Sequence, residues 1–283
     1  EPSFIVKDNW LKGDSIYLHD LANTLYLIKA KKRAGFYEGE IALKITQEME
    51  RSSGVITSED LQNYESIWRE PLIGYYKNYK IISMGPPSSG GACLLQMLKM
   101  LEPFDLNQMG LHSYKSIHCI AEAEKRAFAD RSKYMGDPDF IDVPLTQLLD
   151  SMYLKHRMSN YSSIMATLSD SIFPGNFNFK ESDQTTHYSI VDTYGNAVSV
   201  TTTLNSSYGS GVVVGSAGFL LNNEMDDFSS KPGQPNLYGL IGGEANSIQP
   251  NKRMLSSMTP TILEKNGQLF MVVGTPGGST IIT

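Results

Sequence analysis

The sequence has little of what marks several common classes of protein. Only two of its 283 residues are cysteine, Cys93 and Cys119. Both lie in apolar, helical-looking segments, so we expect buried thiols rather than a disulfide framework. No basic run or basic face stands out: 24 Lys and Arg stand against 30 Asp and Glu, a net charge of -6, which argues against a nucleic-acid partner. No apolar stretch approaches the length of a membrane-spanning helix.

Metal and phosphate sites are also poorly represented. The five histidines are scattered, and although Asp137 and Asp139 could ligate a metal, no cluster of His or Cys joins them. We therefore predict no metal and no cofactor. The segment 88–91, Ser-Ser-Gly-Gly before a helix, could cradle a phosphate. It lacks the full Gly-Lys-Ser/Thr signature, which favours a structural turn.

What remains is the composition of an ordinary globular protein, with 41% hydrophobic and 19% charged residues. The length allows one large domain or two small ones. The chain begins without Met or a signal peptide and ends in Ile-Ile-Thr, which is typical of the middle of a strand. We therefore expect a fragment that lacks native sequence at both ends.

The first half favours helices. Apolar spacing predicts a helix over 18–28 with Gly35 as its stop signal, and further helices over 41–49, 91–101, 113–134 and 145–158. Thr57 has the chemistry of an N-cap, because acidic residues follow it before Leu61. A strand pair is expected near 72–75 and 80–84.

The second half favours strands. Residues 161–184 are polar and without period, which indicates a loop or flexible tail. Strand-like runs follow at 187–192 and 197–204 around a turn at 193–196, and again at 260–263 and 269–273. Helices first and strands later predict an α+β fold with helices packed on antiparallel sheets.

The junction at Thr185 is the most informative stretch. A threonine hydroxyl is a poor nucleophile without a base, and one solution is an N-terminal threonine whose own α-amine is that base. The free α-amine has a pKa of about 7.7–8.0, near operating pH. A polar tail that ends at a strand-opening threonine fits this chemistry. The same pattern is also typical of a plain junction between a loop and a strand.

Longer motifs distinguish these two interpretations. In order along the chain they are Phe36-Tyr37-Glu38-Gly39, Pro86-Pro87-Ser88-Ser89-Gly90-Gly91, Ala121 to Lys125, Asp130-Arg131-Ser132, Thr185 to Asp192, Gly195 to Val198, Thr203-Leu204-Asn205, Leu221 to Phe228, Pro250 to Arg253, Leu255 to Thr261 and Gly274 to Ser279. Together these motifs resemble the gamma-glutamyltranspeptidase family of N-terminal-nucleophile hydrolases over nearly the whole chain. The resemblance implies a four-layer αββα sandwich, in which residues 1–184 are the C-terminal part of a large subunit and 185–283 the N-terminal part of a small one.

The resemblance implies autocatalytic cleavage of the Gln184–Thr185 bond. Thr185 would then attack γ-glutamyl amides, with the hydroxyl of Thr203 bonded to it. Gly277 and Gly278 would supply oxyanion-hole N–H groups, and losing one such donor typically costs about a hundredfold or more in rate. Without the resemblance, Thr203 is one β-propensity threonine among three and Pro-Gly-Gly is a simple turn.

The substrate would be a zwitterion held by several residues. The resemblance assigns Asn205, Glu224 and Asp227 to its α-amino group, and Ser256 and Ser257 to its α-carboxylate. It also makes Tyr238 an aromatic residue of a lid loop. Without the resemblance, Tyr238 would be interpreted as an exposed loop tyrosine with no role in the site.

The implied activity is that of a gamma-glutamyltransferase or glutathione hydrolase. Its partners would be glutathione and other γ-glutamyl compounds, amino acid or dipeptide acceptors, and its own other subunit. A periplasmic, secreted or cell-surface location is expected from the family. Two alternatives stay open: a hydrolase of poly-γ-glutamate or acyl amides, and an unprocessed, catalytically silent relative. Thr280 and Met254 stand where the family usually has Arg and Pro, and the family's carboxylate-binding arginine cannot be placed.

Overall fold

The computed structural model describes residues 9–173, 185–236 and 241–282. Contacts divide the chain into two compact units, Glu1–Trp68 with Tyr208–Asn222, and Arg69–Ser207 with Asn223–Thr283. The expected division between 1–184 and 185–283 does not coincide with the boundary between these two units, and it stays a prediction. In the part of the chain that the structure describes, no helix is both long and apolar enough to cross a membrane.

The smaller unit is built on helices α1 (His19–Lys31), α2 (Ala34–Tyr37), α3 (Gly39–Ser52) and α4 (Ser58–Asn63), with the short strands β5 (Val213–Val214) and β6 (Phe219–Leu220). Its core forms because α3 turns Ile41 and Ile45 toward Val214 and Ala217.

Local signals in this unit were mostly predictive. Thr57 caps α4 through a capping box, in which its hydroxyl accepts from the Asp60 N–H at 3.2 Å and the Asp60 carboxylate accepts from the Thr57 N–H at 2.7 Å. The prediction that Gly35 stops the first helix is wrong. Helix α1 already ends at Lys31, where Lys32 takes a positive φ of 55°, and Gly35 lies inside α2.

The larger unit holds a four-stranded antiparallel sheet in the order β1-β2-β7-β8. Its strands are β1 (Leu72–Tyr76), β2 (Tyr79–Ser83), β7 (Thr261–Lys265) and β8 (Gln268–Val273), in two hairpins as expected. The two hairpins join where β2 pairs with β7, with Ser83 opposite Thr261. Segments almost 180 residues apart in sequence therefore share one sheet.

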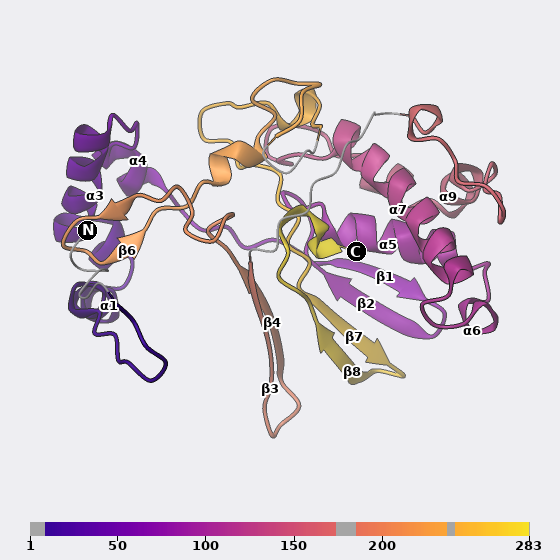
Figure 1. Cartoon of the computed structure of the whole chain (residues 1–283), viewed down its shortest axis with the longest axis horizontal. Helices are drawn as coiled ribbons and strands as arrows, with labels where there is room; N and C mark the ends of the chain where they lie inside the picture. The colour runs from indigo at the N-terminus through magenta and orange to yellow at the C-terminus, as the bar shows by residue number, and fades with distance from the viewer. Residues whose placement is uncertain (1–8, 174–184, 237–240, 283) are drawn as a thin grey trace. The chain divides into compact units, whose positions relative to one another are not determined.

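Helices cover this sheet (Figure 1). Helix α5 (Gly90–Leu101) packs on β1 and β2, and α7 (Tyr114–Tyr134) and α9 (Ser151–Arg157) pack on α5. Shorter pieces complete this part: α6 (Leu106–Met109), α8 (Leu145–Leu148) and η1 (Ser169–Ser171). The continuous helix predicted over 145–158 is wrong, because Asp150 interrupts it and caps α9 by accepting from the Tyr153 N–H at 2.8 Å.

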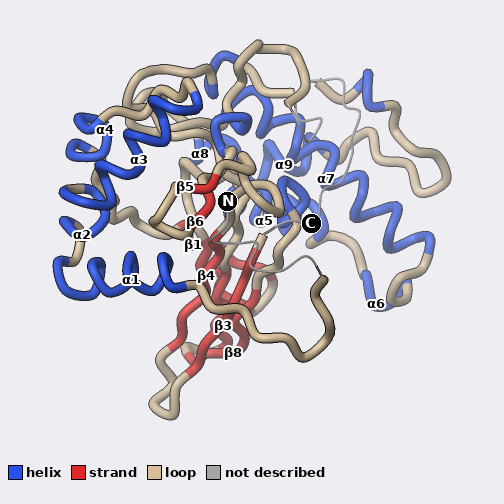
Figure 2. The backbone as a smooth tube through the Cα atoms, turned by 60° about the vertical axis from the view of Figure 1, so that its left-hand side comes forward, coloured by secondary structure: helices blue, strands red, loops and turns tan. Residues whose placement is uncertain are grey.

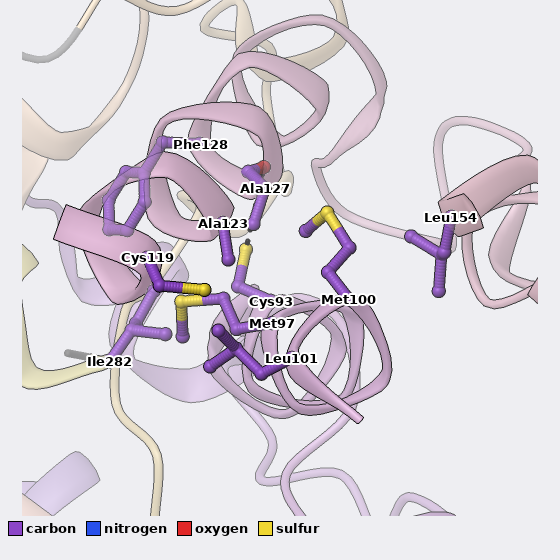
Figure 3. Packing of buried hydrophobic residues seen from close by; sticks show 10 residues of the cluster. All are labelled: Cys93, Met97, Met100, Leu101, Cys119, Ala123, Ala127, Phe128, Leu154 and Ile282. Carbon is purple, nitrogen blue, oxygen red and sulfur yellow. Dashed lines mark hydrogen bonds between the residues drawn. The ribbon is translucent and has the colours of Figure 1, made fainter. Parts of the chain in front are cut away.

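The apolar core between these helices is shown in Figure 3. Helix α5 contributes Cys93, Met97, Met100 and Leu101, and α7 contributes Cys119, Ala123, Ala127 and Phe128. Both cysteines are buried free thiols, as predicted. Burial raises the pKa of the Cys93 thiol to about 12, which makes it a packing residue rather than a nucleophile.

A third hairpin carries the junction that the sequence singles out. Strands β3 (Thr186–Val191) and β4 (Ala197–Thr202) pair around a turn in which the Asp192 carboxylate accepts from the backbone N–H groups of Tyr194 and Asn196, both at 2.9 Å. The hairpin packs against β7 and β8 (Figure 2). The Ser199 hydroxyl joins both strands, since it accepts from the Thr261 N–H at 3.1 Å and donates to the Val273 carbonyl at 3.3 Å.

Candidate active site

The hairpin register brings the two expected catalytic threonines together. Thr186 pairs with Thr202, so one step further Thr185 lies across from Thr203. The Thr185 hydroxyl donates to the Thr203 hydroxyl over a long 3.4 Å, and the Asn205 N–H donates to that same Thr203 oxygen at 2.8 Å. Asn205 reaches this position with a φ of 74°, a left-handed conformation that asparagine tolerates better than most residues. The pair is half-buried at the end of the hairpin.

A glycine turn meets the same hydroxyl from the other side. Gly277 has a φ of 141° and Gly278 a φ of 56°, in the stretch that follows β8 and opens the 3-10 helix η4 (Gly278–Ile282). This conformation turns the Gly278 N–H toward the Thr185 hydroxyl oxygen, at 3.4 Å. A residue with a Cβ would be strained at Gly277, which explains a physical need for glycine there. The arrangement can direct a backbone donor at charge that develops on a bound carbonyl oxygen.

An acidic turn lies next to Asn205. The 3-10 helix η2 (Glu224–Asp227) presents Asp227, whose carboxylate accepts from the Asn205 side-chain amide at 3.3 Å. Asn246, in η3 (Glu244–Asn246), donates to the Asp227 carbonyl at 2.7 Å and so fixes the turn. Hydrogen bonds therefore link Gly278, Thr185, Thr203, Asn205 and Asp227 in one chain.

Glu224 and Asp227, the two carboxyls expected to bind the ammonium, both have raised pKa values. Burial, reinforced by the neighbouring Asp227, raises the pKa of Glu224 to about 7. Burial also raises the pKa of Asp227 to about 6, against the lowering effects of the Arg131 charge and the Asn205 hydrogen bond. Such pairs gain from a cationic ligand, because it stabilises the ionised forms that burial disfavours.

The serine pair is tied to the turn before α5. The Ser89 hydroxyl donates to the Ser256 carbonyl at 2.9 Å, and the Ser88 hydroxyl donates to the Met258 carbonyl at 2.7 Å with the Ser256 carbonyl further away at 3.3 Å. The backbone adds two more, from the Ser89 N–H to the Ser256 carbonyl at 2.9 Å and from the Ser256 N–H to the Pro87 carbonyl at 3.0 Å. Both hydroxyls of the Ser-Ser-Gly-Gly turn thus donate to the backbone of residues 256–258, and both serines are fully buried, in keeping with the structural interpretation of that turn.

Arg131 is the residue that the sequence did not single out. It is buried on α7 and donates to the Ser89 hydroxyl at 2.8 Å and to the Ser257 hydroxyl at 3.0 Å. Its position within the Asp130-Arg131-Ser132 motif, at the end of a long amphipathic helix, was the available signal. The motif alone does not predict which residues Arg131 contacts, because Ser257 is 126 residues away in sequence.

Two cavities accompany these groups. One, of about 390 Å³, is lined by the hairpin end, including Thr185, Thr203 and Ser206. The other, of about 170 Å³, is lined by Arg131, Asp227 and Leu255, among others. The reacting oxygen and the charged groups therefore each border space that a small polar molecule could occupy.

Some predicted residues do not join the site. Tyr238 and Gln184 lie outside the described residues. His187, the imidazole nearest to Thr185 in sequence, faces the Thr201 hydroxyl at 2.9 Å and the Ser189 hydroxyl at 3.1 Å through its two ring nitrogens. Asp139 and Asp137 form ion pairs with Arg69 instead of a metal cluster. Among the described residues, no group of His, Cys, Asp and Glu is placed to hold a metal.

Comparison with known proteins identifies the family. The family model described as gamma-glutamyltranspeptidase matches residues 4–283. The glutathione hydrolase proenzyme of Escherichia coli (strain K12) is 50% identical over 272 residues, which cover 96% of this chain and 47% of the relative. The chain thus spans about half the length of the curated relatives it matches.

Solved structures give the fold. The crystal structure of Helicobacter pylori gamma-glutamyltranspeptidase matches 59% of this chain and 48% of its own, with a TM-score of 0.57 and 44% identity. The cephalosporin acylase from Bacillus halodurans matches 90% of this chain and 43% of its own, with a TM-score of 0.72 and 27% identity. The expected α+β fold of the N-terminal-nucleophile hydrolases is therefore confirmed. The chain belongs to the gamma-glutamyltranspeptidase family.

Proposed function

We propose that the protein carrying this chain is a gamma-glutamyltransferase and glutathione hydrolase that matures by cutting its own Gln184–Thr185 bond. One observation carries the proposal: the Thr185 hydroxyl meets a second threonine hydroxyl and a backbone N–H at once. A nucleophile, a group that orients it and a donor for the oxyanion are the parts that acyl transfer needs. Names of the relatives, such as "Glutathione hydrolase proenzyme", support both the substrate class and the processing.

In maturation, the Thr185 oxygen attacks the Gln184 carbonyl carbon and the acyl group shifts from nitrogen to oxygen. Water then hydrolyses the ester, leaving a Gln184 carboxylate and a free Thr185 α-amine. In this view residues 1–184 and 185–283 become parts of a large and a small subunit.

In turnover, the free α-amine of Thr185 takes the proton of the Thr185 hydroxyl while the hydroxyl oxygen attacks the γ-carbonyl carbon of the substrate. The N–H groups of Gly277 and Gly278 stabilise the oxyanion, and Thr203 orients the nucleophile. The leaving amine takes the proton from the Thr185 ammonium as the C–N bond breaks. Water, or the amine of an amino acid or dipeptide acceptor, then removes the γ-glutamyl group from the ester.

The charged residues select the substrate. Glu224, Asp227 and Asn205 hold the α-ammonium, and the hydroxyls of Ser256 and Ser257 donate to the α-carboxylate. From the family resemblance, Tyr238 is proposed as the lid-loop aromatic. A substrate with a free γ-glutamyl end supplies both the ammonium and the carboxylate, whereas a glutaryl chain on a β-lactam has no amine and brings no ammonium to Glu224 and Asp227. A periplasmic, secreted or cell-surface location is proposed from the family resemblance.

The test is a denaturing gel combined with an activity assay. The purified protein should give two bands, and sequencing of the smaller product should start at Thr185. The same preparation should release the aniline from a γ-glutamyl anilide. A single intact band with no hydrolysis would instead support a catalytically silent relative.

Binding of the substrate headgroup should depend on pH. The inhibition constant of glutamate should worsen as pH falls from about 7.5 to about 5.5, approaching tenfold or more per pH unit below the pKa values of Glu224 and Asp227, because protonation removes the charges that hold the ammonium. Measuring inhibition rather than turnover keeps the Thr185 amine out of the result. Glutarate, which has no α-amine, is the control and should not lose affinity in this way. Equal pH profiles for the two ligands would contradict the assignment.

A matched variant separates this role from folding. Asp227→Asn keeps the shape of the side chain and should raise KM for the anilide about 10- to 100-fold, the usual range for a hydrogen bond to a charged group. Self-cleavage should continue at its normal rate, since the substrate's α-amine takes no part in it. Equal damage to both activities would mean that Asp227 supports the fold.

A further inference from the structure

We propose that Arg131 is a positioning residue, which makes the Ser257 hydroxyl a hydrogen-bond donor toward the α-carboxylate of the substrate. The proposal deepens the proposed function and rests on it. Arg131 contacts no substrate itself in this view. It acts through the serine, and through that serine it contributes to the preference for substrates with an α-carboxylate.

The direction of the hydrogen bonds carries the first step. Arg131 can only donate, so the Ser257 oxygen accepts from its guanidinium, at 3.0 Å. The hydroxyl hydrogen of Ser257 must then point away from the guanidinium. The Ser256 oxygen likewise accepts, from the Met258 N–H at 3.1 Å. Among the described residues, neither hydroxyl donates to a protein acceptor, so both keep a hydrogen to offer to an anion.

The second step is the rigidity of the guanidinium. Arg131 is only 5% exposed, and its Nε donates to the Ser89 hydroxyl at 2.8 Å. Ser89 in turn donates to the Ser256 carbonyl at 2.9 Å. One planar group therefore fixes the backbone of one serine and the side chain of the next. A lysine has no such fork, and a single ammonium cannot reproduce both bonds with the same geometry.

The third step is charge. Burial lowers the pKa of Arg131, and the nearby Asp227 opposes that effect. The Arg131 charge in turn lowers the pKa of Asp227, whose other charged or hydrogen-bonding neighbours are Asp226, Glu224 and Asn205. Arg131 thus interacts with both groups that are proposed to hold opposite ends of the zwitterion, Ser257 and Asp227, and it favours the productive state of each.

The test is Arg131→Lys, assayed with two substrates. KM for the γ-glutamyl anilide should rise about 10- to 100-fold, the range for hydrogen bonds to a charged group, with a smaller change in kcat. KM for the 4-aminobutyryl anilide, which lacks the α-carboxylate, should change by less than about threefold, because the Ser257 hydroxyl then has nothing to hold. A similar rise for both substrates would overturn the proposal.

The double variant supplies the readout that a purely structural role would not give. In the Ser257→Ala background, Arg131→Lys should raise KM much less than it does in the wild type, because only the path through Ser89 to Ser256 remains. Full additivity of the two changes would contradict the proposal. Arg126→Lys is the matched control: Arg126 is also buried on α7 but bonds to Glu122 and to the Arg157 carbonyl, so KM should stay unchanged.

Three further outcomes are kept distinct. If Arg131→Lys fails to fold, the Ser89→Ala variant is used instead, because it removes the other hydrogen-bond partner of the guanidinium. Ser89→Ala should raise KM less in the Ser257→Ala background than in the wild type. An equal rise in both backgrounds would overturn the proposal. If the wild-type protein neither cleaves itself nor hydrolyses the anilide, the proposed function has failed. If the wild type is active and Arg131→Lys leaves KM unchanged, the positioning role alone has failed.

Discussion

Thr185→Ala should arrest self-cleavage and lower hydrolysis of γ-glutamyl anilide by about 10⁴-fold or more, the scale of losing a nucleophile. One hydroxyl serves both reactions, and the structure gives that hydroxyl its two neighbours, the Thr203 oxygen and the Gly278 N–H. A gel of the variant should show one intact band, and its activity should fall to the background.

Two matched variants sharpen this result. Thr185→Ser keeps a hydroxyl and should restore cleavage, at a reduced rate. Thr186→Ala changes the next residue, which is exposed and points to the opposite face of the strand. That variant should cleave and hydrolyse nearly as the wild type does. Complete cleavage of Thr185→Ala would remove Thr185 as the nucleophile of maturation.

Blocking the α-amine of Thr185 in the cleaved protein should lower kcat by about 10² to 10⁴-fold, the usual contribution of a general base. The hydroxyl stays in place, so the experiment isolates the base from the nucleophile. Acetylation can be located by mass spectrometry, and the loss of activity should follow the fraction of Thr185 that is acetylated rather than the acetylation of lysines.

The pH dependence of kcat tests the role of the Thr185 amine as the base in a second way. The amine must be neutral to accept a proton, so kcat should rise with pH through the pKa of that amine, which is about 7.7–8.0 when free. Burial lowers such a pKa, and the carboxylates Glu224 and Asp227 raise it. An acetylated enzyme with normal turnover would move the role of base elsewhere. His187→Asn is the matched control and should keep most of the activity, because both ring nitrogens already face hydroxyls.

Local chemistry made much of the fold predictable. The capping box at Thr57 and Asp60 needs only four residues, and the turns at Asp192 and Asn266 have short-range signals of their own. Alternating apolar residues and those turns set the hairpin register, and the register in turn places Thr185 opposite Thr203. Where the local signal is ambiguous, prediction failed: residues 145–158 have helical spacing throughout, yet the side chain of Asp150 starts a new helix.

The site residues that lie within sequence motifs could be predicted, whereas contacts between distant segments could not. Asn205 and Asp227 could be named from the motifs, although their roles remain predictions. Arg131 could not be paired with Ser257, because no local rule links a helix to a turn 126 residues later. Nor could the pKa of Glu224 be foreseen, since burial produces it and burial is a property of the whole fold.

The pairing of β2 with β7 has a consequence for the refolding of the cleaved protein. Tyr79–Ser83 and Thr261–Lys265 are on opposite sides of the proposed cut, as are Arg131 and Ser257. Before the cut, these contacts form within one molecule and folding is independent of concentration. Afterwards they hold two polypeptides together, and refolding from denaturant becomes a second-order encounter between strands that have lost their covalent tether. Maturation would therefore leave an enzyme that is assembled once and is not readily rebuilt.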